Sequence, residues 1–263
     1  MKRCLHLVIL VFLSVFFFGC LTTEYNLATN KQETLLYGTG KEIKIGDSVS
    51  RQLEAKHSIS TQIDINEQAQ RVFHRIVAVC DRKELVYIIK IIDEEELNAL
   101  SLPGGYVYVY KGLLDKLEND DQLAGIIAHE IGHITAKHAM KRLQGSYGAI
   151  AAQILAVGTG DPKAVGATNL ALASIISGYS RQDELEADRL AVKYTRKAGY
   201  DPNAMLDVLN LLKEEMLESP RRPVALFRTH PHLNERIAAL NMELKGKMEF
   251  KDYLNLTQEE DVF

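Results

Sequence analysis

The sequence is poor in cysteine and has no surplus of positive charge, and each shortage excludes a class of protein. Its 263 residues include 31 Lys and Arg against 35 Asp and Glu, a formal net charge of -4. Nucleic-acid binding needs a basic surface, so no nucleic-acid partner is expected. The hydrophobic content of 46% and charged content of 25% are typical of globular chains and argue against a disordered or polytopic membrane protein.

The three cysteines do not provide an intramolecular disulfide framework. Cys4 lies in an N-terminal leader, Cys20 is a candidate lipid site, and Cys80 is then alone. Because Cys80 ends an apolar helical pattern, we expect it to be a buried core residue and not a reactive thiol.

The N-terminus has the pattern of an export signal. Lys2 and Arg3 precede an apolar run over residues 7–18, and Gly19 and Cys20 follow. The run is shorter than the roughly 20 residues that span a bilayer. Residues 17–20, Phe-Phe-Gly-Cys, resemble a bacterial lipobox in which Cys20 is lipidated, although the two Phe residues depart from the usual pattern. An ordinary secreted protein or an uncleaved anchor is the alternative. Cleavage before Cys20 changes the net charge to -6.

The remaining pattern predicts an α+β domain that is mostly helical with a small sheet. We expect a signal peptide over 1–19, a polar lipid-anchored tether over 20–45, one domain over 46–244 and a C-terminal tail over 245–263. Apolar periodicity predicts helices near 45–53 and 65–76, and over 120–143, 182–198, 202–217 and 233–244. Strands are expected over 85–92 and 106–110, with a turn at 98–105 between them. The Ala- and Gly-rich segment 147–177 is expected to form a flap over the site, or else plain core helices.

The clearest motif is His129-Glu130-Ile131-Gly132-His133. Four residues along an α-helix turn by about 400°, so the two His side chains lie on one face and can bind one metal ion. Zn²⁺ held by two imidazoles and a third protein ligand activates a water molecule, and Glu130 can accept its proton. The alternative is a pair of ordinary core or surface histidines.

The third ligand distinguishes the classes of zinc enzyme. The metzincin pattern is excluded because positions 136 and 139 are Ala136 and Ala139. His138, about 140° around the helix from His133, is expected to be a solvated surface residue. A later helix offers Glu184 as the third ligand and Asp188, one turn on, as an acceptor for the ring N–H of a ligand histidine. Otherwise these acids would form an ordinary solvated helix face.

These motifs resemble those of the gluzincin metallopeptidases, a family that includes the CAAX prenyl endopeptidases and bacterial periplasmic lipoprotein proteases. The resemblance rests on residues 129–133, on Ser-Arg-Gln-Asp-Glu-Leu-Glu-Ala-Asp at 180–188, and on Thr229-His230-Pro231 before Glu235-Arg236-Ile237. It covers about residues 46–244.

The resemblance implies a zincin-like fold in which an edge strand of the sheet faces the active-site cleft. It also implies a set of roles: one zinc ion on His129, His133 and Glu184, Glu130 as base, Asp188 beside a ligand, and His230 near the metal, where it stabilises the oxyanion or fills the open position at rest. The segment 98–106 matches a family segment that leads into an edge strand holding peptide. Pro103, Gly104, Gly105 and Tyr106 are therefore candidate substrate-binding residues. Arg236 is expected to make either a structural or a substrate-carboxylate contact.

The sequence therefore predicts a zinc endopeptidase of the bacterial cell envelope. It would be a periplasm-facing lipoprotein, and the outer membrane is favoured over the inner one as the site of its anchor. Its substrates would be polypeptides such as misfolded envelope proteins, cleaved in quality control. The alternative is a self-inhibited metalloprotein that acts as an outer-membrane assembly factor or chaperone-like binder. A purely structural zinc site fits poorly, because such sites are usually Cys-rich.

Overall fold

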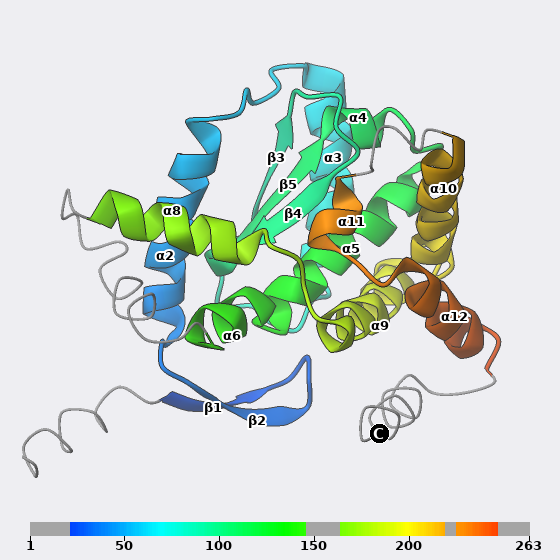
Figure 1. Cartoon of the computed structure of the whole chain (residues 1–263). Coiled ribbons are helices and arrows are strands. Elements are labelled where there is room, and N and C mark those ends of the chain that lie inside the picture. Colours follow the sequence, from blue (N-terminus) through cyan, green and yellow to red (C-terminus); the bar gives the residue numbers. More distant parts are fainter. Residues whose placement is uncertain (1–21, 146–163, 219–224, 247–263) are drawn as a thin grey trace, which may run out of the picture.

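The computed structural model describes residues 22–145, 164–218 and 225–246. The expected signal peptide, Cys20, the first part of the segment 147–177 and nearly all of the C-terminal tail lie outside the described residues. Helices predominate over strands, as the sequence predicts, and they surround a small sheet (Figure 1).

The sheet has three strands in the order β3-β5-β4: β3 is Ile88–Ile92, β4 is Ala99–Leu102 and β5 is Tyr106–Tyr110. β3 runs parallel to β5, and β4 runs antiparallel to it. The strand predicted over 85–92 is shorter than expected, whereas that over 106–110 is confirmed. The expectation of a turn over 98–105 is wrong for its first half, because residues 99–102 form β4 and are all buried. Only the 3₁₀ turn η1, Pro103–Gly105, is a turn.

This topology corrects the placement of the edge strand. β5, which follows Pro103-Gly104-Gly105, is paired on both sides and is the central strand. β4, which precedes that turn, is the edge strand that packs on the central helix α5. Among the described strands, an unpaired edge is therefore offered by β4 and not by the strand that begins at Tyr106.

The helices form the core around α5, Asp120–Thr135, which is buried over most of its length. α9, Arg181–Ala198, packs along α5, and α3 and α10 also contact it (Figure 1). The other helices of the described ranges are α2 (Thr39–Glu54), α3 (Ile63–Val77), α4 (Lys111–Leu114), α6 (His138–Gly145), α8 (Ala164–Ile175), α10 (Ala204–Glu218), α11 (Leu226–Thr229) and α12 (Leu233–Leu244). Cys80 is buried in the core, as predicted.

The helix expected over 120–143 is broken in two. α5 ends at Thr135, and Lys137 has a left-handed backbone with φ 58° before α6 begins at His138. No glycine or proline marks this break in the sequence. The change of direction alters where every later residue of α6 points, His138 above all.

Residues 22–35 of the expected tether form a β-hairpin of β1 (Thr22–Asn26) and β2 (Lys31–Leu35). The hairpin lies against the α5–α6 junction, where the Asn26 side-chain amide donates to the Thr135 carbonyl and Lys137 pairs with Glu24. The expected domain boundary at residue 46 falls inside α2.

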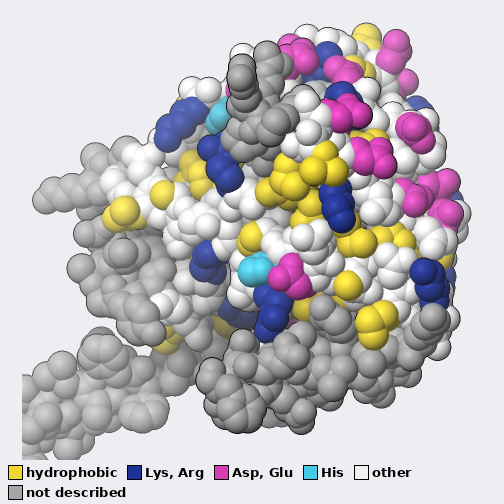
Figure 2. All heavy atoms as spheres, turned by 45° about the vertical axis from the view of Figure 1, so that its right-hand side comes forward, with side chains coloured by type: hydrophobic (Ala, Val, Ile, Leu, Met, Phe, Trp, Pro, Cys, Tyr) yellow, Lys and Arg dark blue, Asp and Glu magenta, His cyan; other side chains and the backbone are white. Residues whose placement is uncertain are grey.

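No described helix combines the length and apolar character needed to cross a bilayer. The face shown in Figure 2 has acidic side chains gathered toward its upper right and basic side chains scattered over it. That distribution on the visible face is consistent with the absence of a basic surplus in the sequence.

Candidate active site

The central helix α5 carries both histidines of the motif on its buried second half. Asn119 caps the helix by accepting from the Gln122 backbone N–H, and Asp120 and Asp121 lie in its first turn. His129 and His133 follow one helical turn apart, with exposed fractions of 3% and 1%. Burial of both rings argues against the reading of this motif as surface histidines.

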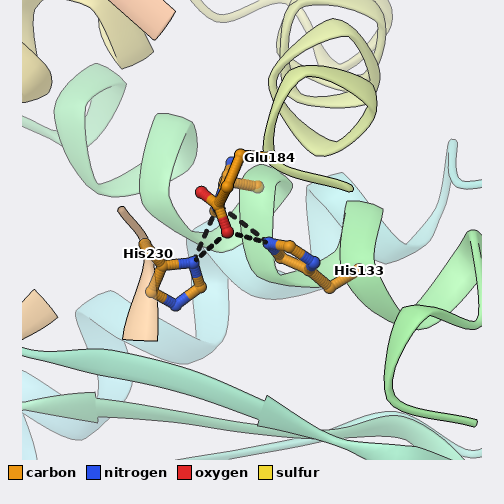
Figure 3. A group of neighbouring side chains, drawn as sticks. His133, Glu184 and His230 are labelled. Atoms are coloured by element: carbon orange, nitrogen blue, oxygen red, sulfur yellow. Dashed lines mark hydrogen bonds and ion pairs between the residues drawn. The ribbon is translucent and has the colours of Figure 1, made fainter. Parts of the chain in front are cut away.

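Glu184 enters the same site from the first turn of α9. A capping box between Ser180 and Asp183 starts that helix, and Glu184, which comes next, is 0% exposed. His230, the residue that ends the short helix α11, approaches from the other side and is 1% exposed. Figure 3 shows the Glu184 carboxylate pointing at His133 and His230.

Four donor atoms lie within 4.8 Å of one another in this cluster. His129 Nε2 is 3.0 Å from His133 Nε2 and 3.3 Å from His230 Nδ1. The Glu184 carboxylate oxygens are 3.5 Å from His129 Nε2, 3.5 Å from His133 Nε2 and 3.1 Å from His230 Nδ1. The site therefore gathers three ring nitrogens and a carboxylate in one buried volume.

These separations fit a zinc ion. Zn–N and Zn–O bonds of about 2.0–2.1 Å in a tetrahedron place neighbouring donors roughly 3.3 Å apart. The five separations given above, 3.0–3.5 Å, bracket that value, and all four donors lie within 4.8 Å of one another. Three buried imidazoles and one carboxylate are also a donor set that zinc prefers.

Glu130 lies beside the cluster with one carboxylate oxygen unpartnered. Its side chain is 1% exposed, and its Oε2 has no hydrogen-bond partner among the described residues. Its Oε1 is 3.3 Å from His230 Nε2. A buried carboxylate oxygen without a partner is costly in a folded protein, so Glu130 has a free acceptor at the donor cluster.

Asp188 and Arg236 hold the far side of the site. Asp188 Oδ1 is 2.8 Å from His129 Nδ1, the ring nitrogen that faces away from the cluster. Arg236 on α12 donates twice to Asp188, at 2.7 and 2.8 Å, and its Nη1 is 2.8 Å from Glu184 Oε2. Burial alone would raise the pKa of Asp188, but the Arg236 guanidinium holds it below its usual range. Arg236 was expected to make either a structural or a substrate-carboxylate contact, and its ion pairs with Glu184 and Asp188 are a structural contact.

His138 was expected to be a solvated surface residue, and this expectation is wrong. Its exposed fraction is 2%, and its Nδ1 is 2.8 Å from His133 Nδ1. The helix break at Lys137 turns it inward, so the angle computed for a continuous helix does not apply. The spacing of five residues from His133 does not predict this contact, because the contact depends on the break at Lys137.

Tyr179 is a second site residue that the sequence analysis did not single out. Its ring stacks on His133 with centroids 3.9 Å apart and an interplanar angle of 18°. Its backbone N–H donates to the Thr229 carbonyl, which fixes the segment before α9 against the segment that carries His230. Tyr179 thus restrains the orientation of the His133 ring.

Of the expected substrate-binding residues, Pro103 shares a pocket with the donor residue His133, whereas Gly104 and Gly105 lie against the backbone of Ile43 and of Val86. Pro103, Gly104 and Gly105 are buried in the turn η1, and Tyr106 begins the central strand. This small pocket, between the end of β4 and the α5–α6 junction, is lined by Pro103 together with Ser101, Leu102, His133, Met140 and Tyr179, among others. The turn itself is pressed on α2, since a Cβ on Gly46 would lie 1.9 Å from the Pro103 carbonyl oxygen.

Similarity to known proteins agrees with this geometry. Residues 64–244 match the model of peptidase family M48. The chain is 29% identical over 207 residues to a putative beta-barrel assembly-enhancing protease of Vibrio cholerae, covering 75% of this chain and 43% of that protein. It is 28% identical over 225 residues to the beta-barrel assembly-enhancing protease of Escherichia coli K12, covering 81% of this chain and 45% of that protein.

A eukaryotic relative is the mitochondrial metalloendopeptidase OMA1 of Schizosaccharomyces pombe, which is 29% identical over 170 residues, or 64% of this chain and 49% of that protein. The chain spans less than half the length of each of these three relatives. With a family match over most of the chain and a buried donor set suited to zinc, the chain belongs to peptidase family M48, a gluzincin family.

Proposed function

We propose that this chain hydrolyses peptide bonds in polypeptides of the bacterial cell envelope, with zinc held by His129, His133 and Glu184. The observation that carries the catalytic part is the unpartnered carboxylate oxygen of Glu130 beside the four gathered donors. Bound zinc supplies Lewis acidity and lowers the pKa of a water molecule to near 7. Glu130 would then accept a proton from the attacking water and donate it to the leaving amine.

The remaining residues of the site fix this arrangement. Asp188 accepts the Nδ1–H of His129 and so presents its Nε2 as the lone-pair donor. Arg236 neutralises part of the charge of two buried carboxylates. An extended peptide would add to the edge of β4 that no described strand pairs, and Pro103, Gly104, Gly105 and Tyr106, which follow β4 in the chain, would contact its end.

The proposed envelope role rests on the N-terminal pattern and on the relatives. The segment before Cys20 has the pattern of an exported lipoprotein, and two relatives are named for enhancing beta-barrel assembly. We therefore propose a lipid anchor at Cys20, attachment to the outer membrane, and quality control of envelope proteins as the setting. In this setting residues 1–19 are removed, the anchored Cys20 directly precedes the hairpin β1–β2, which packs on the domain, and residues 245–263 form the C-terminal tail.

A second candidate function is favoured by the position of His230. Its Nδ1 is 3.3 Å from His129 Nε2 and 3.1 Å from Glu184 Oε1, which supports a role as a fourth zinc donor that would take the place of water. A chain that stayed in this state would be a self-inhibited metalloprotein that acts as an assembly factor or chaperone-like binder.

Replacing Glu130 with Gln separates the two candidates. For an endopeptidase, Glu130→Gln keeps stoichiometric zinc, lowers casein cleavage by roughly 10²- to 10⁴-fold and abolishes the effect in cells. For a binder, the cellular effect persists in Glu130→Gln. Glu67→Gln, the same change at an exposed position of α3, is the matched control and should leave zinc, cleavage and cellular effect unchanged. Unaltered cleavage in Glu130→Gln would overturn the assigned base.

A further inference from the structure

The two histidines of α5 are held in different ways on the side away from the donor cluster. His129 Nδ1 lies 2.8 Å from a carboxylate oxygen of Asp188. His133 Nδ1 lies 2.8 Å from another ring nitrogen, Nδ1 of His138. His138 Nε2 in turn lies 3.2 Å from Glu186 Oε2 and 3.5 Å from Asp183 Oδ1.

The direction of these hydrogen bonds follows from valence. A neutral imidazole has one N–H donor and one bare acceptor nitrogen. When His133 Nε2 faces the metal as the bare nitrogen, its Nδ1 carries the hydrogen and donates to His138 Nδ1. His138 must then carry its own hydrogen on Nε2, which donates to the carboxylate of Glu186.

The series of hydrogen bonds from His133 through His138 to Glu186 depends on an unfavourable backbone conformation. Lys137 adopts φ 58°, a backbone region that non-glycine residues seldom occupy, and the turn it makes brings His138 back under His133. The Lys137 ammonium is held by Glu24 of the hairpin at 2.6 Å. His138 is 2% exposed, so water does not compete freely for its ring nitrogens.

We propose that His138 is a positioning residue that fixes the tautomer and ring orientation of His133 for zinc, with Glu186 as the terminal acceptor. This inference rests on the proposed zinc site but assigns a residue outside it. His133 is thereby polarised by a neutral ring, whereas His129 is polarised directly by a carboxylate. The two zinc-binding rings are consequently not equivalent as donors.

The test compares His138→Leu with His138→Asn in the full chain purified in detergent. Leu and Asn are close in size, but only Asn places an acceptor oxygen near the position of Nδ1. The dissociation constant for zinc is measured by competition with a chromophoric chelator, and unfolding of the metal-free protein is followed by circular dichroism. We expect His138→Leu to raise the zinc dissociation constant by about 10- to 100-fold and His138→Asn to stay within a few-fold of wild type.

Two further variants keep the test decisive. Leu143→Ala removes a buried side chain of the same helix without touching His133, and it should lower thermal stability while leaving zinc affinity unchanged. Glu186 lies nearer the surface than His138, and Glu186→Ala removes only the terminal acceptor of the hydrogen-bond series. It therefore tests the contribution of that series to zinc binding even if His138→Leu fails to fold. It should weaken zinc binding by a smaller factor.

The outcomes separate this inference from the proposed function. Zinc affinity in His138→Leu equal to wild type, or equal losses in the Leu and Asn variants, would overturn the positioning role while leaving the zinc site intact. If His138→Leu does not fold, unaltered zinc affinity in Glu186→Ala overturns it. A wild-type chain that binds no zinc would instead overturn the proposed function itself.

Discussion

Gly132 of α5 lies directly against the backbone of Ala187 in α9. A Cβ added to Gly132 would come 3.0 Å from the Ala187 carbonyl oxygen and 3.2 Å from its Cα. Because α5 carries His129 and His133 and α9 carries Glu184, this close approach sets the separation of the zinc donors.

Gly132→Ala is therefore expected to weaken zinc binding as well as the fold. The extra methyl group must push the helices apart, and such overpacking costs about 1–3 kcal/mol in the free energy of unfolding. Chemical denaturation and chelator competition measure the two effects. Gly125→Ala is the matched control, because on the same helix its Cβ would meet Met205 of α10 at 2.9 Å. Equal loss of zinc affinity in both variants would contradict the role given to the Gly132 contact.

Replacing Arg236 is expected to destabilise the metal-free protein more than the zinc-loaded one. Arg236 is 1% exposed and pairs with two fully buried carboxylates, Glu184 and Asp188. Arg236→Met leaves these charges without their partner, which costs roughly 3–5 kcal/mol, and bound zinc replaces part of the lost positive charge. Thermal unfolding with chelator and with zinc gives the two values. A drop that is the same in both conditions would show that the guanidinium does not act through the charge of the carboxylates.

Zinc binding at neutral pH is expected to release a proton from His129. Burial and Arg236 lower the pKa of this ring, but its hydrogen bonds with Asp188 and Glu184 raise it, to about 9 in the metal-free protein. Burial holds the pKa of His133 well below its usual value, so that ring is already neutral. Only unprotonated imidazole binds zinc, so affinity should fall about tenfold per pH unit as pH drops below about 9.

Calorimetry of zinc binding in buffers of different ionisation enthalpy measures that release. Slopes near one proton per zinc at pH 7, before any ionisation of a bound water, are expected for the wild-type chain. Asp188→Asn removes the carboxylate that favours the charged ring, so its release should be smaller. A pH-independent affinity between pH 6 and about 8 would contradict this prediction.

His230→Ala is expected to accelerate cleavage by the zinc-loaded enzyme. His230 Nδ1 is 3.1 Å from Glu184 Oε1 and 3.3 Å from His129 Nε2, so its removal opens one position of the donor cluster to water. Casein cleavage per bound zinc is the appropriate measure, since zinc affinity itself should fall. His232→Ala, two residues on and outside the donor cluster, is the control. Slower cleavage with unchanged KM would instead assign His230 to the oxyanion.

The residues of the zinc site can be predicted from the sequence where they lie close together along the chain. His129 and His133 share one turn of one helix, and Glu184 and Asp188 share one turn of another, so spacing alone groups each pair. His138 was misplaced because the break at Lys137 has no glycine or proline to signal it. β4 was missed because four residues between two turn-like segments give too short a pattern, and its pairing to β5 is a tertiary contact. The hairpin at 22–35 has polar strands, which periodicity does not detect.

That hairpin limits how far the enzyme can reach. One residue separates Cys20 from the start of β1 at Thr22, and two peptide units extend at most about 7 Å. With a lipid on Cys20, as proposed, the folded body would rest at the bilayer surface with no slack to swing away from it. Such an enzyme would cleave polypeptides that come to the membrane surface and would not cleave those that stay in solution away from it.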